Sequence, residues 1–439
     1  MSEEVVKPGY KRTEVGVIPE DWDAITIEDL VKKIGASILT GPFGTLLKAN
    51  EYSTDGVPII SVGEIGEGTV KIKENTPKAP PEVIKRLPQY ILKTGDVVFA
   101  RKGSVDRSSL IEPNQNGWFL GSDGMRLRLP SNVFPSYISL QIRSPDVRQW
   151  LVNNAIGTTM ASLNQDILSK IQFPLPPLPE QHAIAAALSD ADGLIGALET
   201  LITKKRAIKQ AAMQQLLTGR TRLPGFAGEW ETKRLGDIIT FLPTANNPRA
   251  DLNDGGEIEY IHYGDVHTHG KPVLDCKECK LPHIFRDKIG EIIRLEDGDL
   301  IMVDASEDLE GTGKSVEIQG AFGREIVAGL HTILCRGNPN QWAIGFKAYL
   351  QFIPAFKSKL VCVATGISVY AISKKELAEI ELAIPSVSEQ AVIVAFLSDM
   401  DADITALEHW RDKTKQIKKG MMQQLLTGKV RLVTPEEAG

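Results

Sequence analysis

The feature that most constrains this chain is an internal repeat. Residues 180–223 and 389–432 align without a gap at an offset of 209 positions, and 24 of the 44 aligned residues are identical. The seven residues MQQLLTG are the same in both copies, from Met213 to Gly219 and from Met422 to Gly428. Agreement at a fixed period is the signature of duplicated structural units. The chain is therefore built as two halves.

The segments before the two copies keep their length but not their sequence. Trp22 lies 158 residues before Glu180, and Trp230 lies 159 residues before Glu389. Each half thus has a variable block followed by a nearly identical block. We expect the variable blocks to perform one task in two different ways and the repeated blocks to perform the same task twice.

The repeated blocks have the periodicity of helices. Apolar residues recur in steps of three and four, at Ile184, Leu188, Ile195, Leu198 and Ile202 in copy one and at Ile393, Leu397, Met400, Ile404 and Leu407 in copy two. Gly219 and Gly428 stand where a left-handed residue would end each helix, and Ser388 is expected to cap the second. A helix from Glu180 to Thr218 would be about 58 Å long at ~1.5 Å per residue. One apolar stripe of that length needs a partner helix, and the other copy is the nearest candidate.

The connection between the halves predicts the direction of the helices. About ten residues separate Gly219 from Trp230, so the second variable block begins near the end of the first helix. The second helix must then run back along the first, with an imperfect seam near Lys205 and Thr414. We therefore predict a mixed α/β chain in which two globular α/β domains are separated by an antiparallel coiled coil, with a pseudo-two-fold repeat. The predicted parts are domain one at 1–175, spacer helix one at 176–222, domain two at 223–383, and spacer helix two with the C-terminal tail at 384–439.

The variable blocks alternate strand-like and helix-like patterns. Apolar runs bounded by Gly, Pro or Asp predict strands, at 57–62, 95–101, 124–129, 299–304 and 330–336. A helical pattern follows at 134–155.

Composition limits the function and the environment. The net charge is −6, from 50 basic and 56 acidic residues, whereas nucleic-acid binders usually carry a basic footprint. Any DNA contact must come from local patches or be shared with a more basic partner. No apolar stretch is long enough to span a membrane, the N-terminus has no signal-peptide pattern, and four cysteines do not form a disulfide framework. We expect a cytoplasmic protein without a membrane partner.

Catalytic and metal motifs are incomplete. GTGKS at 311–315 resembles the end of a phosphate-binding loop, but Asp308 replaces the glycine that the full pattern needs. Cys276 and Cys279 have zinc-like spacing, with His283 nearby, although a closed site needs four ligands. The fourth could come from His262, His267 or His269; the alternative is two ordinary cysteines in a hairpin. We expect no catalytic residue, no metal and no cofactor in this chain.

Several motifs carry a family resemblance. They are GPFGTLLK (41–48), KTGDVVFARKGS (93–104), PLPPLPEQ (174–181), IPSVSEQ (384–390), DASEDLEGTGK (304–314), AGLHTIL (328–334) and the twin QQLLTG segments. With two variable blocks alternating with two nearly identical helices, the whole chain resembles the specificity subunit of a type I restriction–modification system. It departs from the family pattern at Ser388, where copy one has Pro179.

The resemblance implies a non-catalytic chain that reads double-stranded DNA. Each domain would read one half of a bipartite site, and the helices would set the gap and hold two copies of the modification subunit. Those subunits carry S-adenosylmethionine and methylate adenine, and restriction subunits with motor and nuclease activity can join. Two different domains imply an asymmetric target, with half-sites roughly 34 Å apart.

Two alternatives from other classes remain. One is a stand-alone DNA methyltransferase, which the missing cofactor and catalytic motifs disfavour. The other is a structural scaffold with no DNA role, in which the helices form a mere dimerisation hairpin. A scaffold would not explain why the repeated blocks agree while the blocks between them differ.

Basic, polar and glycine-rich loops are the candidate DNA contacts, together with a strand on which Arg126 and Arg128 alternate, so that one face of it is basic. In block one they are Gly41, Gly44, Thr45, Lys48, Arg101, Lys102, Ser104, Arg107, Arg126 and Arg128. In block two they are Asn246, Asn247, Arg249, His262, Tyr263, His267, His269, Lys271, Lys314 and His331. The alternative for each is a solvated charge or a structural turn. The repeated residues predicted to bind partner subunits are Glu180, Gln181, Gln214, Gln215, Leu216, Leu217, Glu389, Gln390, Gln423, Gln424, Leu425 and Leu426.

Overall fold

The computed structural model describes residues 6–157, 160–308, 311–366 and 369–433. The chain divides into two compact units. Unit 1 contains Met1–Leu198 and Trp410–Gly439, and unit 2 contains Glu199–His409. Each unit thus holds one variable block and a part of each repeated block. Within the described ranges, no helix is long and apolar enough to cross a membrane.

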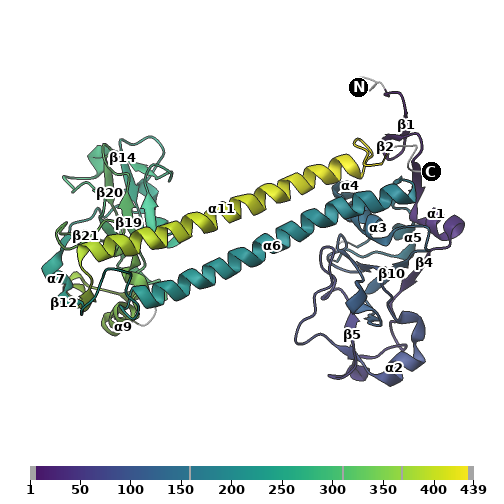
Figure 1. Ribbon diagram of the computed structural model, residues 1–439, viewed down its shortest axis with the longest axis horizontal. Coiled ribbons are helices and arrows are strands. Elements are labelled where there is room, and N and C mark those ends of the chain that lie inside the picture. The colour runs from purple at the N-terminus through teal and green to yellow at the C-terminus, as the bar shows by residue number, and fades with distance from the viewer. Residues whose placement is uncertain (1–5, 158–159, 309–310, 367–368, 434–439) are drawn as a thin grey trace. The chain divides into compact units, whose positions relative to one another are not determined.

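The repeated blocks form two long helices, α6 (Leu178–Leu216) and α11 (Val387–Leu425), of 39 residues each. They lie side by side (Figure 1). Both begin two residues before the predicted start. Ser386, not Ser388, accepts the backbone N–H of Glu389 on its hydroxyl at 3.3 Å, so the predicted cap is wrong by two positions. The glycines that follow the helices have φ of 68° at Gly219 and 70° at Gly428, which confirms the left-handed ends.

Ion pairs join the two helices within each unit. They are Lys205–Asp403 at 2.8 Å and Lys209–Asp401 at 2.5 Å in unit 2, and Lys418–Asp192 at 2.5 Å in unit 1. Residue numbers fall on α11 as they rise on α6, so the helices are antiparallel. The polar pairs of unit 2 lie where the apolar stripe was expected to slip, near Lys205. The imperfect seam is therefore a charged stretch within continuous helices.

Unit 1 is built on two sheets. The main sheet has the antiparallel order β4–β10–β7–β8, and the smaller one has the order β6–β5–β9. Their bounds are β4 Ser37–Thr40, β5 Val57–Ile60, β6 Lys78–Ala79, β7 Val97–Ala100, β8 Ser108–Leu110, β9 Phe119–Leu120 and β10 Gly124–Arg128. Further strands pair as β1 (Tyr10–Thr13) with β2 (Gly16–Pro19) and β3 (Asp23–Thr26) with β11 (Gln172–Leu175). The helices are α1 Ile27–Asp29, α2 Pro81–Arg86, α3 Pro135–Ile142, α4 Pro145–Asn154 and α5 Gln165–Ser169.

Unit 2 repeats the arrangement of a main and a smaller sheet, with an additional edge strand, β15, in the main sheet. Its main sheet has the order β13–β21–β17–β19–β15 and its smaller sheet the order β16–β14–β20, while β12 pairs with β23 and β18 with β22. The strands are β12 Glu231–Arg234, β13 Ile239–Leu242, β14 Ile258–Ile261, β15 Val273–Asp275, β16 His283–Ile284, β17 Leu300–Val303, β18 Ala305–Ser306, β19 Ser315–Gln319, β20 Ile326–Ala328, β21 Thr332–Gly337, β22 Tyr370–Ala371 and β23 Glu381–Ile384. The helices are α7 Leu235–Ile238, α8 Tyr263–Thr268, α9 Pro354–Val363 and α10 Lys374–Ala378.

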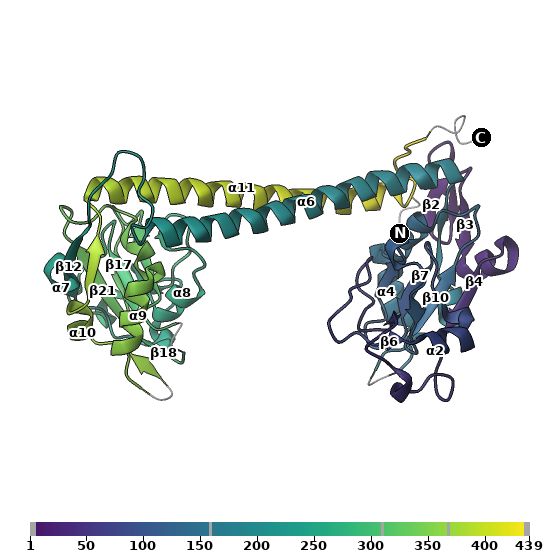
Figure 2. The same ribbon diagram turned by 60° about the horizontal axis from the view of Figure 1, so that its bottom comes forward.

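The inner strands of both main sheets are buried on both faces. In β7, Val97 and Phe99 pack in the cluster that contains α3 and the start of α6, whereas Val98 and Ala100 pack toward the smaller sheet. The residues of β17 alternate in the same way, and α9 and α10 lie beside its sheet (Figure 2). Two buried faces explain why these strands read as continuous apolar runs.

Candidate DNA interface

In unit 1 the two predicted glycine-rich and basic loops meet. The loop after β4 presents Phe43, which is 60% exposed, and the guanidinium of Arg101 lies 5.5 Å from the centre of its ring. Lys102 forms a 2.9 Å ion pair with Asp123, which directly precedes β10. Gly44 adopts a φ of 66°, which suits an exposed turn. A cationic side chain and an aromatic ring thus share one surface.

The other candidates of these loops are on or near the surface. Thr45, Lys48 and Arg107 are exposed, and Ser104 is half-buried. The carbonyl of Ser104 accepts the Arg107 amide at 3.1 Å, which closes a turn after β7. These four residues stay candidates for backbone contacts to a ligand.

Three candidates in unit 1 have structural roles instead. A Cβ at Gly41 would lie 1.7 Å from the carbonyl oxygen of Gly121, so this glycine allows two backbones to pack. Arg126 is buried and donates to the carbonyl of Gln89 at 3.2 Å. Arg128 binds the buried carboxylate of Asp96 through two bonds of 2.7 Å. The prediction that these two arginines form a DNA-facing strand is wrong: they share a face, but the segment around Gln89 covers it.

The Arg128–Asp96 pair is repeated in unit 2. Arg336 of β21 binds both oxygens of Asp299 at 2.8 and 2.7 Å. The bonds to Asp299 raise the pKa of Arg336 above its ordinary value. Two-point bonding between guanidinium and carboxylate is among the stronger polar contacts in proteins. The repetition marks this pair as part of the common framework.

In unit 2 the aromatic candidates gather around α8. The ring of Tyr263 lies nearly perpendicular to the rings of His267 and His331, with ring centres 6.1 and 5.5 Å apart. These three residues line a hollow of about 410 Å³ together with Ala305, Ser306, Glu307, Asp308 and Val369. Burial lowers the pKa of His267, which favours its neutral form at neutral pH.

His262 and its neighbours are held by local bonds. His262 is buried, and its Nδ1 accepts the Gly264 amide at 3.2 Å at the start of α8, so its role as a DNA contact is a wrong prediction. Arg249 is exposed but pairs with Asp265 at 2.7 Å. The remaining candidates of this region are Asn247, which donates to the carbonyl of Lys288 at 3.2 Å, and the exposed Asn246.

A second hollow of about 540 Å³ lies beside the first and contains His267, His269, Lys271 and Lys314. Lys314 donates to the carbonyl of His267 at 2.5 Å, and a ring nitrogen of His269 lies 2.8 Å from the carbonyl of Val273. The ammonium of the GTGKS segment is therefore engaged with the backbone. Of the segment 304–314, Leu309 and Glu310 lie outside the described residues.

The cysteines with zinc-like spacing do not meet further ligands. Cys276 is buried, and burial raises the pKa of its thiol to about 12, whereas a zinc ligand must be a thiolate. Over the described ranges, no group of three His, Cys, Asp or Glu side chains could hold a metal ion.

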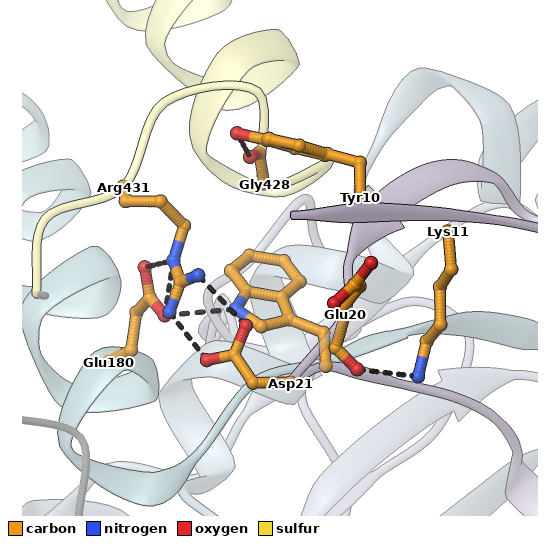
Figure 3. Close-up of polar contacts among 8 residues, drawn as sticks. Tyr10, Lys11, Glu20, Asp21, Glu180, Gly428 and Arg431 are labelled. Atoms are coloured by element: carbon orange, nitrogen blue, oxygen red, sulfur yellow. Dashed lines mark hydrogen bonds and ion pairs between the residues drawn. The ribbon is translucent and has the colours of Figure 1, made fainter. Parts of the chain in front are cut away.

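The start of each long helix carries the same cluster of Trp, Glu and Arg. In unit 1 the carboxylate of Glu180 accepts the indole N–H of Trp22 at 2.9 Å and Nε of Arg431 at 2.7 Å (Figure 3). Arg431 also binds Asp21 through bonds of 2.9 and 2.8 Å. Its guanidinium lies 5.6 Å from the centre of the Trp22 ring. The segment after α11 is thereby fixed to the beginning of α6.

Unit 2 contains the equivalent cluster. Glu389 accepts Nε and Nη2 of Arg222 at 2.5 and 2.6 Å and the indole N–H of Trp230 at 3.2 Å. The left-handed glycines lie against the same rings: a Cβ at Gly219 would lie 3.3 Å from Trp230, and one at Gly428 would lie 3.2 Å from Trp22. The repeated Glu and Gly therefore serve contacts within each unit.

Most residues predicted to bind partner subunits are buried inside the chain, so that prediction is wrong for their side chains. Gln181 accepts the Phe134 amide, and Gln390 accepts the Ala343 amide, both at 2.9 Å. The buried members of the set are Glu180, Gln181, Leu216, Leu217, Glu389, Gln390, Leu425 and Leu426. The exposed members are Gln214, Gln215, Gln423 and Gln424, and these remain available to a partner.

The sequence does not reveal residues whose contacts depend on the tertiary structure. Phe43 belongs to the GPFGTLLK motif, but nothing in the sequence predicts its contact with Arg101. Asp123 and Asp304 give no signal, because carboxylates do not suggest a DNA contact. Arg222 and Arg431 were detectable, since they occupy equivalent positions of the repeat.

The comparisons with known proteins agree with this framework. The family described as the type I restriction modification DNA specificity domain matches residues 19–210 and 340–419. These ranges cover more than half of the chain, and the chain belongs to this family. It is the specificity subunit of a type I restriction–modification system, a DNA-recognition component and not a catalytic one.

Relatives match over nearly the full length. A protein of Methanocaldococcus jannaschii assigned as the MjaX specificity subunit of a type I restriction enzyme is 25% identical over 97% of both chains. The MjaVIII specificity subunit of the same organism is 22% identical over 94% of both. The fold is shared with the S subunit of M. genitalium, at a TM-score of 0.53 and 16% identity, covering 92% of this chain and 96% of that one. A chain from a type I R-M system, solved in work on complex assembly, gives a TM-score of 0.58 at 16% identity over 94% and 99%.

Proposed function

We propose that this specificity subunit binds a bipartite, asymmetric site in double-stranded DNA and that each variable block reads one half. The observation that carries the proposal is that one framework is built twice with different side chains on its loops. Unit 1 places Arg101 and Phe43 on its surface, whereas unit 2 places Tyr263 and His331. Different side chains on one framework favour two different half-sites.

We propose that the modification subunits bind along the helices. Exposed apolar residues recur seven positions apart at equivalent places of the repeat, Leu201 and Ile208 on α6 in unit 2 and Trp410 and Ile417 on α11 in unit 1. A seven-residue spacing of apolar side chains is the pattern that a further helix recognises. Because the pattern occurs twice, it supports two copies of one partner.

The chemistry then belongs to the partners. The modification subunits supply S-adenosylmethionine and methylate an adenine that is flipped into their own pocket, and restriction subunits join the same assembly. These partners also share the neutralisation of DNA phosphates, which fits the net charge of −6 on this chain.

The pure chain should transfer no labelled methyl group to DNA, and adding the modification subunit should restore the transfer. Transfer by the pure chain would contradict the proposal.

A domain exchange tests the division into half-sites. Residues 20–175 are replaced by the corresponding block of another family member, and the complex with its modification subunit is mapped by single-molecule detection of methylated adenine. We expect one half-site to change while the other half and the gap stay the same. A change in both halves, or in neither, would contradict the proposal. As the matched control, residues 228–384 are exchanged in the same way, which should change only the other half-site.

A further inference from the structure

Arg101 in unit 1 and Asp304 in unit 2 occupy the same position of the repeated framework. Each directly follows the inner strand of its main sheet, β7 or β17. The amide of Arg101 donates to the carbonyl of Asp123 at 2.9 Å, and the amide of Asp304 donates to that of His331 at 3.2 Å. The carbonyl of each accepts a 2.8 Å bond from the hairpin before the next helix, from the amide of Leu163 in unit 1 and of Ile372 in unit 2. The backbone frame is thus the same on both sides of the position.

The charges on this common frame are reversed. In unit 1 the cations Arg101 and Lys102 follow the strand, and the anion Asp123 stands opposite. In unit 2 the anion Asp304 follows the strand, and His331 stands opposite, with its Nδ1 3.3 Å from Oδ1 of the carboxylate. Among the residues that the structure describes, the Arg101 guanidinium has no hydrogen-bond acceptor and Oδ2 of Asp304 has no donor. Each position therefore offers one unused group, a donor in unit 1 and an acceptor in unit 2.

The backbone of unit 2 is strained at this point. His331 has a φ of 55°, and it is the one non-glycine residue with a positive φ within the described ranges. Such a conformation persists where the surroundings impose it, often at functional sites. Here the ring of Tyr263 and the carboxylate of Asp304 hold the imidazole at the rim of the 410 Å³ hollow.

We propose that these two positions are base-reading sites of opposite polarity. Arg101 donates to a guanine in the half-site of unit 1. Asp304 accepts from the exocyclic amino group of an adenine or cytosine in the half-site of unit 2. This inference rests on the proposed function.

The chemistry of the base edges supports both assignments. Guanine presents two acceptors in the major groove, which arginine matches, whereas the amino groups of cytosine and adenine are donors that a carboxylate accepts. Glu307 and Asp308 line the same hollow as His331 and repel phosphate oxygens. The ligand of the unit 2 site is therefore a hydrogen-bond donor on a base and not the DNA backbone.

The test uses the full chain assembled with its modification subunit, with genome-wide methylation mapping as the readout. Asp304→Asn should reduce discrimination at one adenine or cytosine of one half-site by roughly ten-fold or more, because the variant loses the charged acceptor. Arg101→Gln should do the same at one guanine of the other half-site. Asp254→Asn and Lys32→Ala are matched controls on exposed ion pairs of units 2 and 1, and they should leave every base preference unchanged.

The outcomes separate this inference from the proposed function. If the wild-type complex methylates no defined bipartite site, the proposed function fails. If the wild-type site is bipartite but Asp304→Asn changes no position, changes both halves, or slows methylation equally at all sequences, the inference alone is wrong. Should Asp304→Asn not assemble, His331→Asn serves as the second variant, because asparagine tolerates a positive φ. It should relax the same base of the same half-site, and an unchanged preference would overturn the inference.

Discussion

Unit 1 and unit 2 share the order of their main-sheet strands, apart from the additional edge strand β15 of unit 2, but not their loop chemistry. The residues that recur serve the frame: Glu180 and Glu389 bind a tryptophan and an arginine, and Asp96 and Asp299 bind the arginine of a neighbouring strand. The residues that differ stand on the loops after the inner strands. The two units therefore agree in the residues that bury polar groups and differ in the surface loops that are proposed to contact DNA.

The shared clusters also differ in two respects. The unit 1 cluster has a second carboxylate, Asp21, on Arg431, whereas the Arg222 guanidinium of unit 2 donates to the carbonyl of Gly228. Trp22 is fully buried, while Trp230 is only half-buried. The framework should therefore be more sensitive to damage in unit 1 than in unit 2.

The largest expected effect is the loss of the buried glutamates. Glu180→Ala removes the shared acceptor of Trp22 and Arg431, and breaking a buried pair costs roughly 3–5 kcal/mol of unfolding free energy. Glu389→Ala should cost less because its tryptophan is half-buried. Urea unfolding of the full chain measures both. Asp403→Ala is the control: its carboxylate is 62% exposed in its ion pair, and its loss should cost less than about 1 kcal/mol. Equal losses in all three variants would contradict the framework role of the glutamates.

A smaller effect distinguishes Arg101, which is proposed to contact a base, from Arg128, which belongs to the framework of the same unit. Arg101→Ala should weaken DNA binding by the assembled complex by about 1–3 kcal/mol and leave unfolding unchanged. Arg128→Ala should destabilise the chain, since it leaves the buried Asp96 carboxylate without its guanidinium, and should not alter base preference. Binding titrations on a panel of DNA sequences measure the difference. If Arg101→Ala weakened all sequences equally, Arg101 would contact a phosphate, and if Arg128→Ala relaxed one base, it would belong to the reading surface.

The smallest effect concerns the short helix α1 that follows β3 in unit 1 and the equivalent helix α7 that follows β12 in unit 2. Asp29 binds Lys33 and Thr26, and these bonds lower its pKa from 3.8 to about 2. The folded pKa is below the unfolded one, so the stabilisation is present above pH 4 and disappears as the pH falls toward 2. Asp29→Asn should cost about 1 kcal/mol at neutral pH and remove this acid dependence. The equivalent turn of unit 2 has no side-chain cap, so Asp237→Asn should change little. The test measures the unfolding free energy of both variants between pH 2 and pH 7. Equal losses of unfolding free energy in the two variants would contradict the role of Asp29.

The sequence predicted the helices and inner strands because their signals are local. Periodic apolar residues and bounded runs such as 95–101 depend on neighbours along the chain, and the repeat supplied the pairing of the helices. The errors arose where tertiary contacts decide. Alternation placed Arg126 and Arg128 on one face but could not tell that backbone from 88–91 covers it. A repeated glutamate at Glu180 looked like a binding residue, whereas the buried Trp22 and the distant Arg431 give it a structural role.

The site was predicted only in part for the same reason. Basic loops are visible in sequence, so Arg101 and Lys102 are predicted as candidates. The acidic position proposed above is not, because only the backbone bonds of Asp304 to His331 and Ile372, which match those of Arg101, show that the two positions are equivalent. The sequence alone gives the sign of the charge on Asp304. Only the comparison with the equivalent position of unit 1 shows where in the framework this charge lies.

In the proposed function, the loops of the variable blocks recognise the DNA while the two long helices set the gap between the half-sites. One measurement tests this division most directly. Four residues inserted after Thr203, with a matching insertion after Asp412, lengthen both helices by about 6 Å at ~1.5 Å per residue and nearly preserve their phase. With about 3.4 Å per base pair, methylation mapping of the assembled variant should give the same half-site bases separated by roughly one or two more base pairs. An unchanged gap would contradict the spacing role of the helices, and altered half-site bases would contradict the confinement of recognition to the variable blocks.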